Sequence, residues 1–140
     1  MAFFIGTDIE FAIRLILAVF FGGLIGIERE VSHKPAGLRT HMLVSIGSAL
    51  FTIMSIDVFG GDPARVAANI VTGIGFIGGG SIIASRGHIH GITTAASLWA
   101  TAAIGLGVGA GAYTISAVGA FLIFVILNLK RIEKQIGKYF

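Results

Sequence analysis

The side chains best suited to chemistry in this chain gather in one short stretch, residues 28–41, which reads EREVSHKPAGLRTH. It holds five of the chain's ten basic and seven acidic side chains, and two of its four histidines. Arginines near a helix N-terminus suit an anion, such as a lipid phosphate, a nucleotide phosphate or a partner's carboxylate. In the alternative interpretation Glu28 and Arg39 form an ion pair that fastens a loop, and both interpretations stay open here. The first charged cluster comprises Glu28, Arg29, Arg39, Thr40, His41 and Arg86.

A second group of charges lies elsewhere along the chain, and its carboxylates could bind a hard cation such as Mg²⁺ or Ca²⁺. We favour a structural interpretation. Asp62 stands before Pro63, the pattern of an N-cap followed by the proline preferred in the first helical turn. Asp57 would then pair with Arg65 or Arg14. The second charged cluster comprises Arg14, Asp57, Asp62 and Arg65.

Arg14 follows Glu10 by one helical turn, so the two side chains can pair near the outer end of a membrane helix. A charge at the centre of a bilayer would cost about 2.5–3.5 kcal/mol, and a position near the surface avoids much of this. In the alternative, Arg14 pairs with Asp57 or Asp62 on a neighbouring helix and fixes the outer end of the bundle.

No residue pattern indicates an enzyme. The chain has no cysteine, which excludes a disulfide framework and a thiol catalyst. His88 and His90 have no carboxylate near them in sequence, so the histidines suit a pH sensor better than a metal site. Gly73, Gly75 and Gly78 match the GxGxxG spacing, but that fingerprint needs a preceding strand in a βαβ unit. We predict no catalytic residues, no metal and no cofactor.

The composition predicts a membrane protein. Charged residues make up 12% of the chain and the mean hydropathy is +0.93, whereas soluble domains are about 25% charged. A transmembrane helix needs ~20 mostly apolar residues, and nothing here shows the alternation of a membrane barrel. We predict a single domain, residues 1–140, that folds as an all-α bundle of about five transmembrane helices. The five predicted spans are residues 9–27, 42–59, 66–85, 92–109 and 112–129.

The basic residues predict an orientation. The first and third connections and the C-terminal tail are rich in Lys, Arg and His, the second connection is mixed, and the fourth has no charge. Because cytoplasmic loops are enriched in Lys and Arg, we expect the N-terminus outside and the C-terminus in the cytoplasm. The last twelve residues, LKRIEKQIGKYF, predict an amphipathic helix on the anionic cytoplasmic leaflet.

Glycines inside the spans predict close helix contacts. Ala18, Gly22 and Gly26 lie four residues apart, so they share one face that allows two helix backbones to approach. That face could pack within the chain or form a homodimer. In the third span we expect a break or kink, since each glycine weakens a helix by ~1 kcal/mol. This interruption falls at Gly78, Gly79 and Gly80, which would form a packing notch or the wall of a polar cavity; the other glycines of the GxGxxG stretch are Gly73 and Gly75.

The fourth span begins GITTAASLW. Thr93 or Thr94 is a good N-cap for it. Trp99 lies about two turns further, too deep for an interfacial belt. We expect Trp99 to fill the space that the third-span glycines leave, with an acceptor for its indole N–H.

Four segments together carry a family resemblance, which covers roughly residues 14–125. They are GLIGIERE, PAGLRTHMLVSIGSALF, DPARVAANIVTGIGFIGGG and GITTAASLWATAAIGLGVG, and in this order they resemble the MgtC/SapB family of bacterial inner-membrane proteins. The resemblance implies links to magnesium limitation, acid resistance and survival inside host cells. It also implies regulation of other membrane machinery, such as the ATP synthase, in place of magnesium transport. Many members carry a soluble C-terminal domain, and we expect this chain to be a short form without it.

Two functions follow from this sequence. The first is a regulatory membrane protein that binds a membrane partner, or a second copy of itself, with no nucleic acid involved. The second is a small transporter or channel for a cation or proton. A carrier needs polar groups across the membrane depth, whereas the ionisable residues here fall near the ends of the spans. This distribution favours the regulator.

Overall fold

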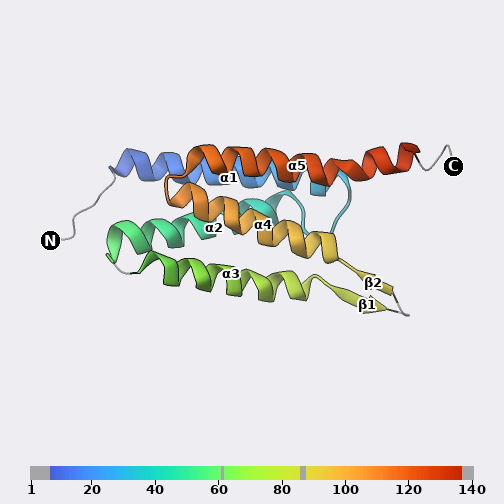
Figure 1. Ribbon diagram of the computed structural model, residues 1–140, viewed down its shortest axis with the longest axis horizontal. Helices are drawn as coiled ribbons and strands as arrows, with labels where there is room; N and C mark the ends of the chain where they lie inside the picture. The colour runs from blue at the N-terminus through green and yellow to red at the C-terminus, as the bar shows by residue number, and fades with distance from the viewer. Residues whose placement is uncertain (1–6, 61, 86–87, 137–140) are drawn as a thin grey trace.

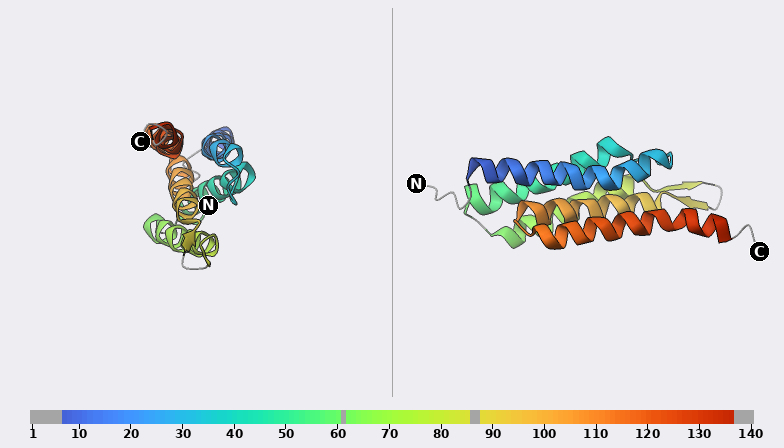
Figure 2. Two further views of the ribbon diagram at one scale, coloured as in Figure 1. Left: turned by 90° about the vertical axis from the view of Figure 1, so that its right-hand side faces the viewer. Right: turned by 90° about the horizontal axis from the view of Figure 1, so that it is seen from above.

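The computed structural model describes residues 7–60, 62–85 and 88–136. Its helices lie side by side, each antiparallel to the next along the chain (Figure 1). α4 contacts all four other α-helices, whereas α3 lies at the edge, mainly against α4 (Figure 2). In chain order the elements are α1 (Asp8–Val31), α2 (Leu38–Ile53), the π-helical turn η1 (Met54–Val58), α3 (Pro63–Gly80), β1 (Ile83–Ser85), β2 (His88–His90), α4 (Ile92–Gly109) and α5 (Tyr113–Ile136).

The connections alternate between the two ends of the bundle. The α1–α2 loop, the hairpin and the C-terminal end of α5 lie together at one end, which we name the hairpin end (Figure 1). The start of α1, the η1–α3 connection and the turn between α4 and α5 lie at the opposite end. The connections at the hairpin end are the ones that the charge pattern predicts on the cytoplasmic side. Those at the opposite end are the ones that it predicts outside.

α1, and α2 together with η1, are longer than the predicted apolar spans. α1 begins after Thr7, whose side chain accepts a hydrogen bond from the Glu10 N–H at 3.2 Å, as an N-cap does. It continues through Glu28 and Arg29, which are buried inside the protein. α2 passes without a break into η1, where one π-helical turn changes which residues face inward.

α3 corrects the predicted interruption. The helix begins at Pro63 with Asp62 as its N-cap, as the sequence predicts, and the Asp62 carboxylate accepts the Ala64 N–H at 3.0 Å. It then runs unbroken through all five glycines and ends at Gly80. Glycine weakens a helix but keeps its backbone N–H and C=O, so a supported helix can contain several. The support comes from α4, because Gly78 is buried at ordinary contact distance from Ala95.

A short antiparallel hairpin, β1 and β2, joins α3 to α4, and the sequence reading had no strand here. The hairpin also corrects the predicted cap. Gly91, not Thr93 or Thr94, is the N-cap of α4, with a φ of +91°. A Cβ at Gly91 would lie 2.1 Å from the Ser81 carbonyl oxygen, so the crossing of the two chain segments requires glycine there.

α5 is a single helix that continues to Ile136, so the predicted amphipathic segment is not a separate helix over the described residues. The rest of that segment, residues 137–140, lies outside the described part of the chain.

The surface and length of the helices are those of a membrane protein. α1, α2 together with η1, and α4 are each long and apolar enough to cross a membrane, and Tyr113–Leu129 of α5 is a shorter apolar helix. Large apolar side chains face outward around the bundle; Phe20 is 62% exposed, Phe76 88% and Phe121 61%. The predicted all-α membrane bundle is confirmed.

Candidate functional site

A stripe of small polar side chains runs along the buried face of α2. Its members follow each other by four, three, four and three residues, which keeps them on one side of a helix. They are His41, Ser45, Ser48, Thr52 and Ser55, all buried. Thr94, Ser97 and Thr101 of α4 are buried in the same way. The stripe was not predicted, although its spacing is visible in the sequence.

Glycines bring the neighbouring helices into contact with the backbone of α2. A Cβ at Gly22 of α1 would lie 2.7 Å from the His41 carbonyl oxygen, and one at Gly26 would lie 2.7 Å from the Leu38 Cα. The face formed by Ala18, Gly22 and Gly26 therefore packs within the chain. Of the two interpretations of this face, the homodimer is wrong, because α2 already covers it.

α4 approaches α2 from the other side in the same manner. A Cβ at Gly105 would lie 2.1 Å from the Ser45 carbonyl oxygen, and one at Gly109 would lie 2.6 Å from that of Ala49. Several of the hydroxyls between these helices bond to their own helix. Thr52 donates to the Ser48 carbonyl and Thr101 to the Ser97 carbonyl, both at 2.8 Å.

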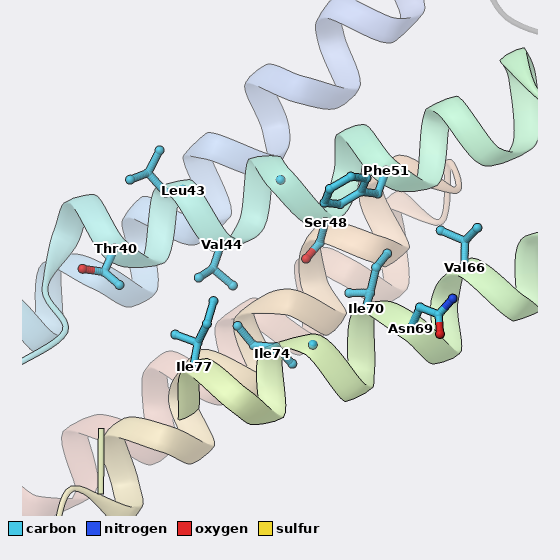
Figure 3. Close-up of a pocket in the computed structure, with 12 residues that line it drawn as sticks. Thr40, Leu43, Val44, Ser48, Phe51, Val66, Asn69, Ile70, Ile74 and Ile77 are labelled. Atoms are coloured by element: carbon cyan, nitrogen blue, oxygen red, sulfur yellow. The ribbon is translucent and has the colours of Figure 1, made fainter. Parts of the chain in front are cut away.

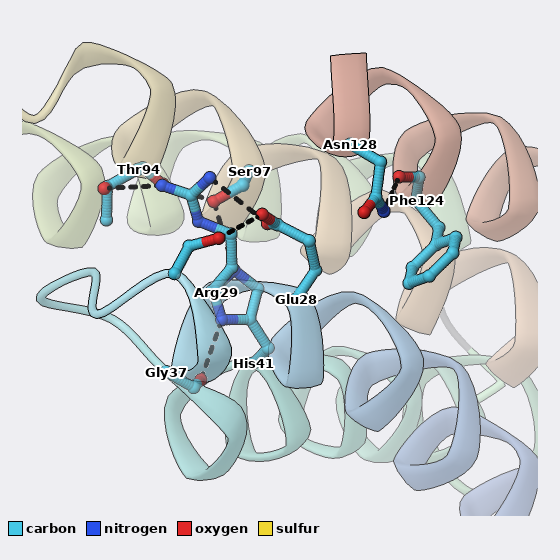
Figure 4. A network of polar contacts seen from close by, with 9 residues as sticks. Glu28, Arg29, Gly37, His41, Thr94, Ser97, Phe124 and Asn128 are labelled. Carbon is cyan, nitrogen blue, oxygen red and sulfur yellow. Dashed lines mark hydrogen bonds and ion pairs between the residues drawn. The ribbon is translucent and has the colours of Figure 1, made fainter. Parts of the chain in front are cut away.

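Glu28 and Arg29 form a buried ion pair where α1, α2 and α4 meet at the hairpin end (Figure 4). Their closest atoms, Glu28 Oε2 and Arg29 Nη1, are 3.4 Å apart, and the two residues are 5% and 3% exposed. Ser32 donates to Glu28 Oε1 at 2.6 Å, and Arg29 Nη2 donates to Thr94 Oγ1 at 3.4 Å. Arg29 Nε is buried without a hydrogen-bond partner in the described part of the chain. The pair thus connects α1 to α4.

His41 lies beside this pair, fully buried, and connects α2 to α4 (Figure 4). Its Nδ1 is 2.9 Å from the Gly37 carbonyl oxygen, which can only accept, so Nδ1 carries a proton. Its Nε2 is 3.1 Å from Ser97 Oγ, and the Thr94 carbonyl oxygen lies 2.8 Å from the same hydroxyl, whose single proton can be donated to only one of the two.

The predicted ion pair between Glu28 and Arg39 is wrong. Arg39 is exposed on α2, and among the described residues the structure gives it no ion pair or hydrogen bond. Glu30 fastens the loop instead, because its Oε2 accepts the Leu38 N–H at 2.9 Å. This carboxylate already occupies the N-terminus of α2, where the sequence suggested an anion. Of the other predicted members, Thr40 lies beside Arg39, and Arg86 lies outside the described residues.

At the opposite end, Arg14 joins four elements. Its Nη1 donates to the Gly109 carbonyl at 2.8 Å and lies 3.5 Å from Asp57 Oδ2. Its Nη2 pairs with Glu10, and its Nε is 3.3 Å from the Tyr113 hydroxyl. Both predicted partners of Arg14, Glu10 and Asp57, are therefore confirmed, while Tyr113 and the Gly109 carbonyl are additions that only the fold reveals.

The other members of the second cluster lie apart from Arg14. Asp62 and Arg65 are exposed at the start of α3, where Asp62 acts as the cap. Asp57 therefore pairs with Arg14 and not with Arg65. The structure brings only Arg14 and Asp57 of this predicted cluster together.

Neither Trp99 nor the α3 glycines make the close contacts that the sequence predicted. Trp99 is 51% exposed on the outside of α4, whereas its neighbour Leu98 is buried against α3. Trp99 therefore does not fill a space beside glycines. Around Gly73, Gly75, Gly79 and Gly80 an added Cβ would meet nothing within 4 Å, and at Gly78 it would lie at an ordinary 3.5 Å from the Ala95 carbonyl oxygen, so none of the five is a packing notch.

An apolar groove separates α2 from α3 and was not predicted (Figure 3). Its cavity volume is about 780 Å³. Gly73 lines it, but its other walls are mainly aliphatic and aromatic, including Leu43, Phe51, Ile70 and Ile77. Gly78, Gly79 and Gly80, where the sequence suggested the wall of a polar cavity, do not line this groove.

These features define a class: a multi-pass α-helical membrane protein whose interior is polar and closely packed, with buried ion pairs near both ends. The chain belongs to the MgtC family, whose family model matches residues 15–135.

Several curated proteins are similar to it. "Putative magnesium transporter YhiD" of Escherichia coli (strain K12) is 47% identical over 129 residues, covering 86% of this chain and 60% of that protein. "Protein MgtC" of Brucella abortus (strain 2308) is 46% identical over 123 residues, covering 87% and 52%. "Protein MgtC" of Salmonella typhimurium (strain 14028s) is 40% identical over 119 residues, covering 85% and 51%. The chain spans half to three fifths of these relatives, and no solved structure matches it.

Proposed function

We propose that this protein is a regulator in the bacterial inner membrane that acts by binding another membrane protein and carries out no catalysis. The resemblance to its family suggests that this role serves adaptation to low magnesium, acid or intracellular stress. The observation that carries the proposal is the closed interior. Gly22 and Gly105 bring α1 and α4 against the α2 backbone, which leaves no room at these levels for a file of water or ions.

The buried charges also fit a structural role. Glu28 pairs with Arg29, and Arg14 pairs with Glu10 and Asp57. A buried charge is stable when it is paired and hydrogen-bonded. The Arg14–Asp57 pair joins α1 to η1, and Arg14 and Arg29 also reach α4, through the Gly109 carbonyl and Thr94. They therefore support a rigid scaffold better than a path along which an ion moves.

The outward face of α3 is the surface we assign to the partner. Ala68, Thr72, Gly75 and Gly79 share this face, and all are exposed. Gly75 and Gly79 form a GxxxG pair, and a Cβ at either would meet nothing within 4 Å. Small residues at this spacing allow a second membrane helix to approach closely. The small residues of α1 at this spacing, Gly22 and Gly26, already pack against α2. Those of α3 are still open to a second helix.

We also propose an orientation. With the hairpin end in the cytoplasm, Lys34, Arg39 and the basic residues of the C-terminal segment lie on the side where membrane proteins carry them. The N-terminal end of α1, with Asp8 and Glu10, then faces out. Cysteines placed at Lys34 and at Asp8 should react with an impermeant maleimide from opposite sides of the membrane.

Photocrosslinking in living cells tests the partner surface. A photoreactive residue at Thr72, which faces outward on α3, should give a discrete protein adduct. The same residue at Phe20, exposed on α1, is the matched control and should give only lipid adducts. Replacing Gly75 and Gly79 together by leucine should remove the Thr72 adduct while the protein still folds, because both positions are open. An adduct at Phe20 alone, or one unchanged by the glycine replacements, would contradict this surface.

A second function, transport of a cation or proton, is favoured by one observation. The buried polar stripe of α2 extends from His41 to Ser55, and Asp57 follows it in η1. Ser45 Oγ and Asp57 Oδ2 are buried without hydrogen-bond partners in the described part of the chain. The printed name of the Escherichia coli relative points to magnesium transport for that protein. Flux measurements on the purified protein separate this function from regulation.

A further inference from the structure

The groove between α2 and α3 opens sideways, toward the surroundings of the bundle, and is mainly apolar, although Ser48 and Asn69 also line it (Figure 3). Val44 of α2 points toward Ile74 and Ile77 of α3 across it, and Leu43 and Phe51 also line it. Glycines on both walls keep it wide, because a Cβ at Gly47 or at Gly73 would meet nothing within 4 Å. In a membrane protein such a groove is in contact with the lipid hydrocarbon.

The groove has the length of one leaflet. Its lining on α2 begins at Thr40 and ends at Phe51, which corresponds to roughly 17 Å at the α-helical rise per residue. Half of the hydrocarbon core of a bilayer is about 15 Å. An acyl chain that descends from the membrane surface at the hairpin end matches the groove.

A polar pocket adjoins the groove at the hairpin end. Both cavities are lined by Thr40 and Leu43, so they lie next to each other. The polar pocket is also lined by Glu30 and Arg39. The Glu30 carboxylate is already used by the Leu38 N–H, whereas the exposed Arg39 guanidinium has no ion pair or hydrogen bond among the described residues. Arg39 is thus the group in this pocket that can bind a ligand, and guanidinium groups bind phosphates.

We propose that the groove and the Arg39 pocket together bind one anionic phospholipid. The acyl chain lies between α2 and α3, and the phosphate contacts Arg39 and the Thr40 hydroxyl. The Glu30 carboxylate, which stays on the Leu38 N–H, disfavours a multiply charged headgroup and suits one with a single phosphate. This site is on the opposite side of α3 from Gly75 and Gly79, so it does not depend on the proposed function.

Native mass spectrometry of the purified protein with phosphatidylglycerol, and separately with zwitterionic phosphatidylcholine, tests this. The wild type should retain one phosphatidylglycerol more strongly than phosphatidylcholine. Arg39→Gln should weaken phosphatidylglycerol binding about tenfold, the effect of losing one charge-assisted hydrogen bond. Arg39→Lys should keep most of the preference. Arg65→Gln, at an exposed arginine near the opposite end, is the matched control and should bind like the wild type.

A second variant tests the groove itself. Gly73→Leu should fill it without a clash and weaken the retention of both lipids, while helical circular dichroism stays that of the wild type. Equal retention of the two lipids by the wild type, or no loss with Arg39→Gln, would overturn the site. Displacement of the lipid by glycerol phosphate would point to a soluble anion instead. A protein adduct from a photoreactive residue at Leu43 would show that a partner helix occupies the groove.

Discussion

At the scale of single residues, Gly105 shows how closely the helices pack. A side chain there would collide with the Ser45 carbonyl, which belongs to a backbone that cannot turn away. We predict that Gly105→Ala lowers the free energy of unfolding by about 3 kcal/mol, at the upper end of the usual effect of overpacking. Gly75→Ala, at an open helical position, should raise it by up to ~1 kcal/mol. Unfolding in detergent, followed by circular dichroism, measures both, and equal effects would contradict the packing described.

The Glu28–Arg29 pair gives a second prediction at this scale. Removing one partner of a buried ion pair leaves a charge without compensation, so Arg29→Met should lower the free energy of unfolding by about 3 kcal/mol. Combining it with Glu28→Leu should recover much of that loss, because no charge is then left buried. Arg65→Met, at an exposed arginine, serves as the control. The pair has no structural role if Arg29→Met is as harmless as Arg65→Met in the same unfolding assay.

What the sequence reveals about residues depends on how local their contacts are. The Asp62 cap and the Glu10–Arg14 pair lie within one helical turn, and both could be predicted. The sequence could not exclude the Glu28–Arg39 pair, because its absence depends on which side of α2 faces α1. Arg39 is two positions before the buried His41, about 200° around α2, so it faces away from Glu28.

At the scale of elements, η1 is a π-helical turn that ends α2 and turns Asp57 toward Arg14. We predict that Asp57→Asn loosens this turn without unfolding α2, because the contacts of His41 and Ser45 are unchanged. Hydrogen exchange should become faster over residues 54–58 and stay as in the wild type over residues 38–53. Thr72→Val, at an exposed position, is the control. A uniform change over α2 and η1 would show that Asp57 supports the whole helix.

The elements themselves could be predicted in part. Apolar stretches located all five helices, and α4 begins and ends where the sequence places it. The hairpin is short, and β1 falls at the end of the predicted third span, residues 66–85. Hydropathy alone therefore could not distinguish it from the helix. The sequence predicted a break in α3 because helix propensity includes the free-energy cost of glycine in a helix. It does not include the stabilising contacts that α3 makes with α4.

At the scale of the whole molecule, α4 joins the other helices, while α3 is attached mainly through α4. This arrangement leaves two surfaces of α3 open, the groove toward α2 and the outward Gly75–Gly79 face. The separation of the ends could be predicted from the charges. The polar stripe and the groove could not, since both depend on which helices are neighbours.

The central claim is that this bundle is closed and acts through binding, and flux in liposomes tests it most directly. The purified, folded protein is placed in liposomes under a magnesium gradient and then under a pH gradient. We predict no flux above that of empty liposomes, because α1 and α4 contact the backbone of α2. Flux that exceeds this background and disappears in Asp57→Asn would contradict the account and make the polar stripe a pathway.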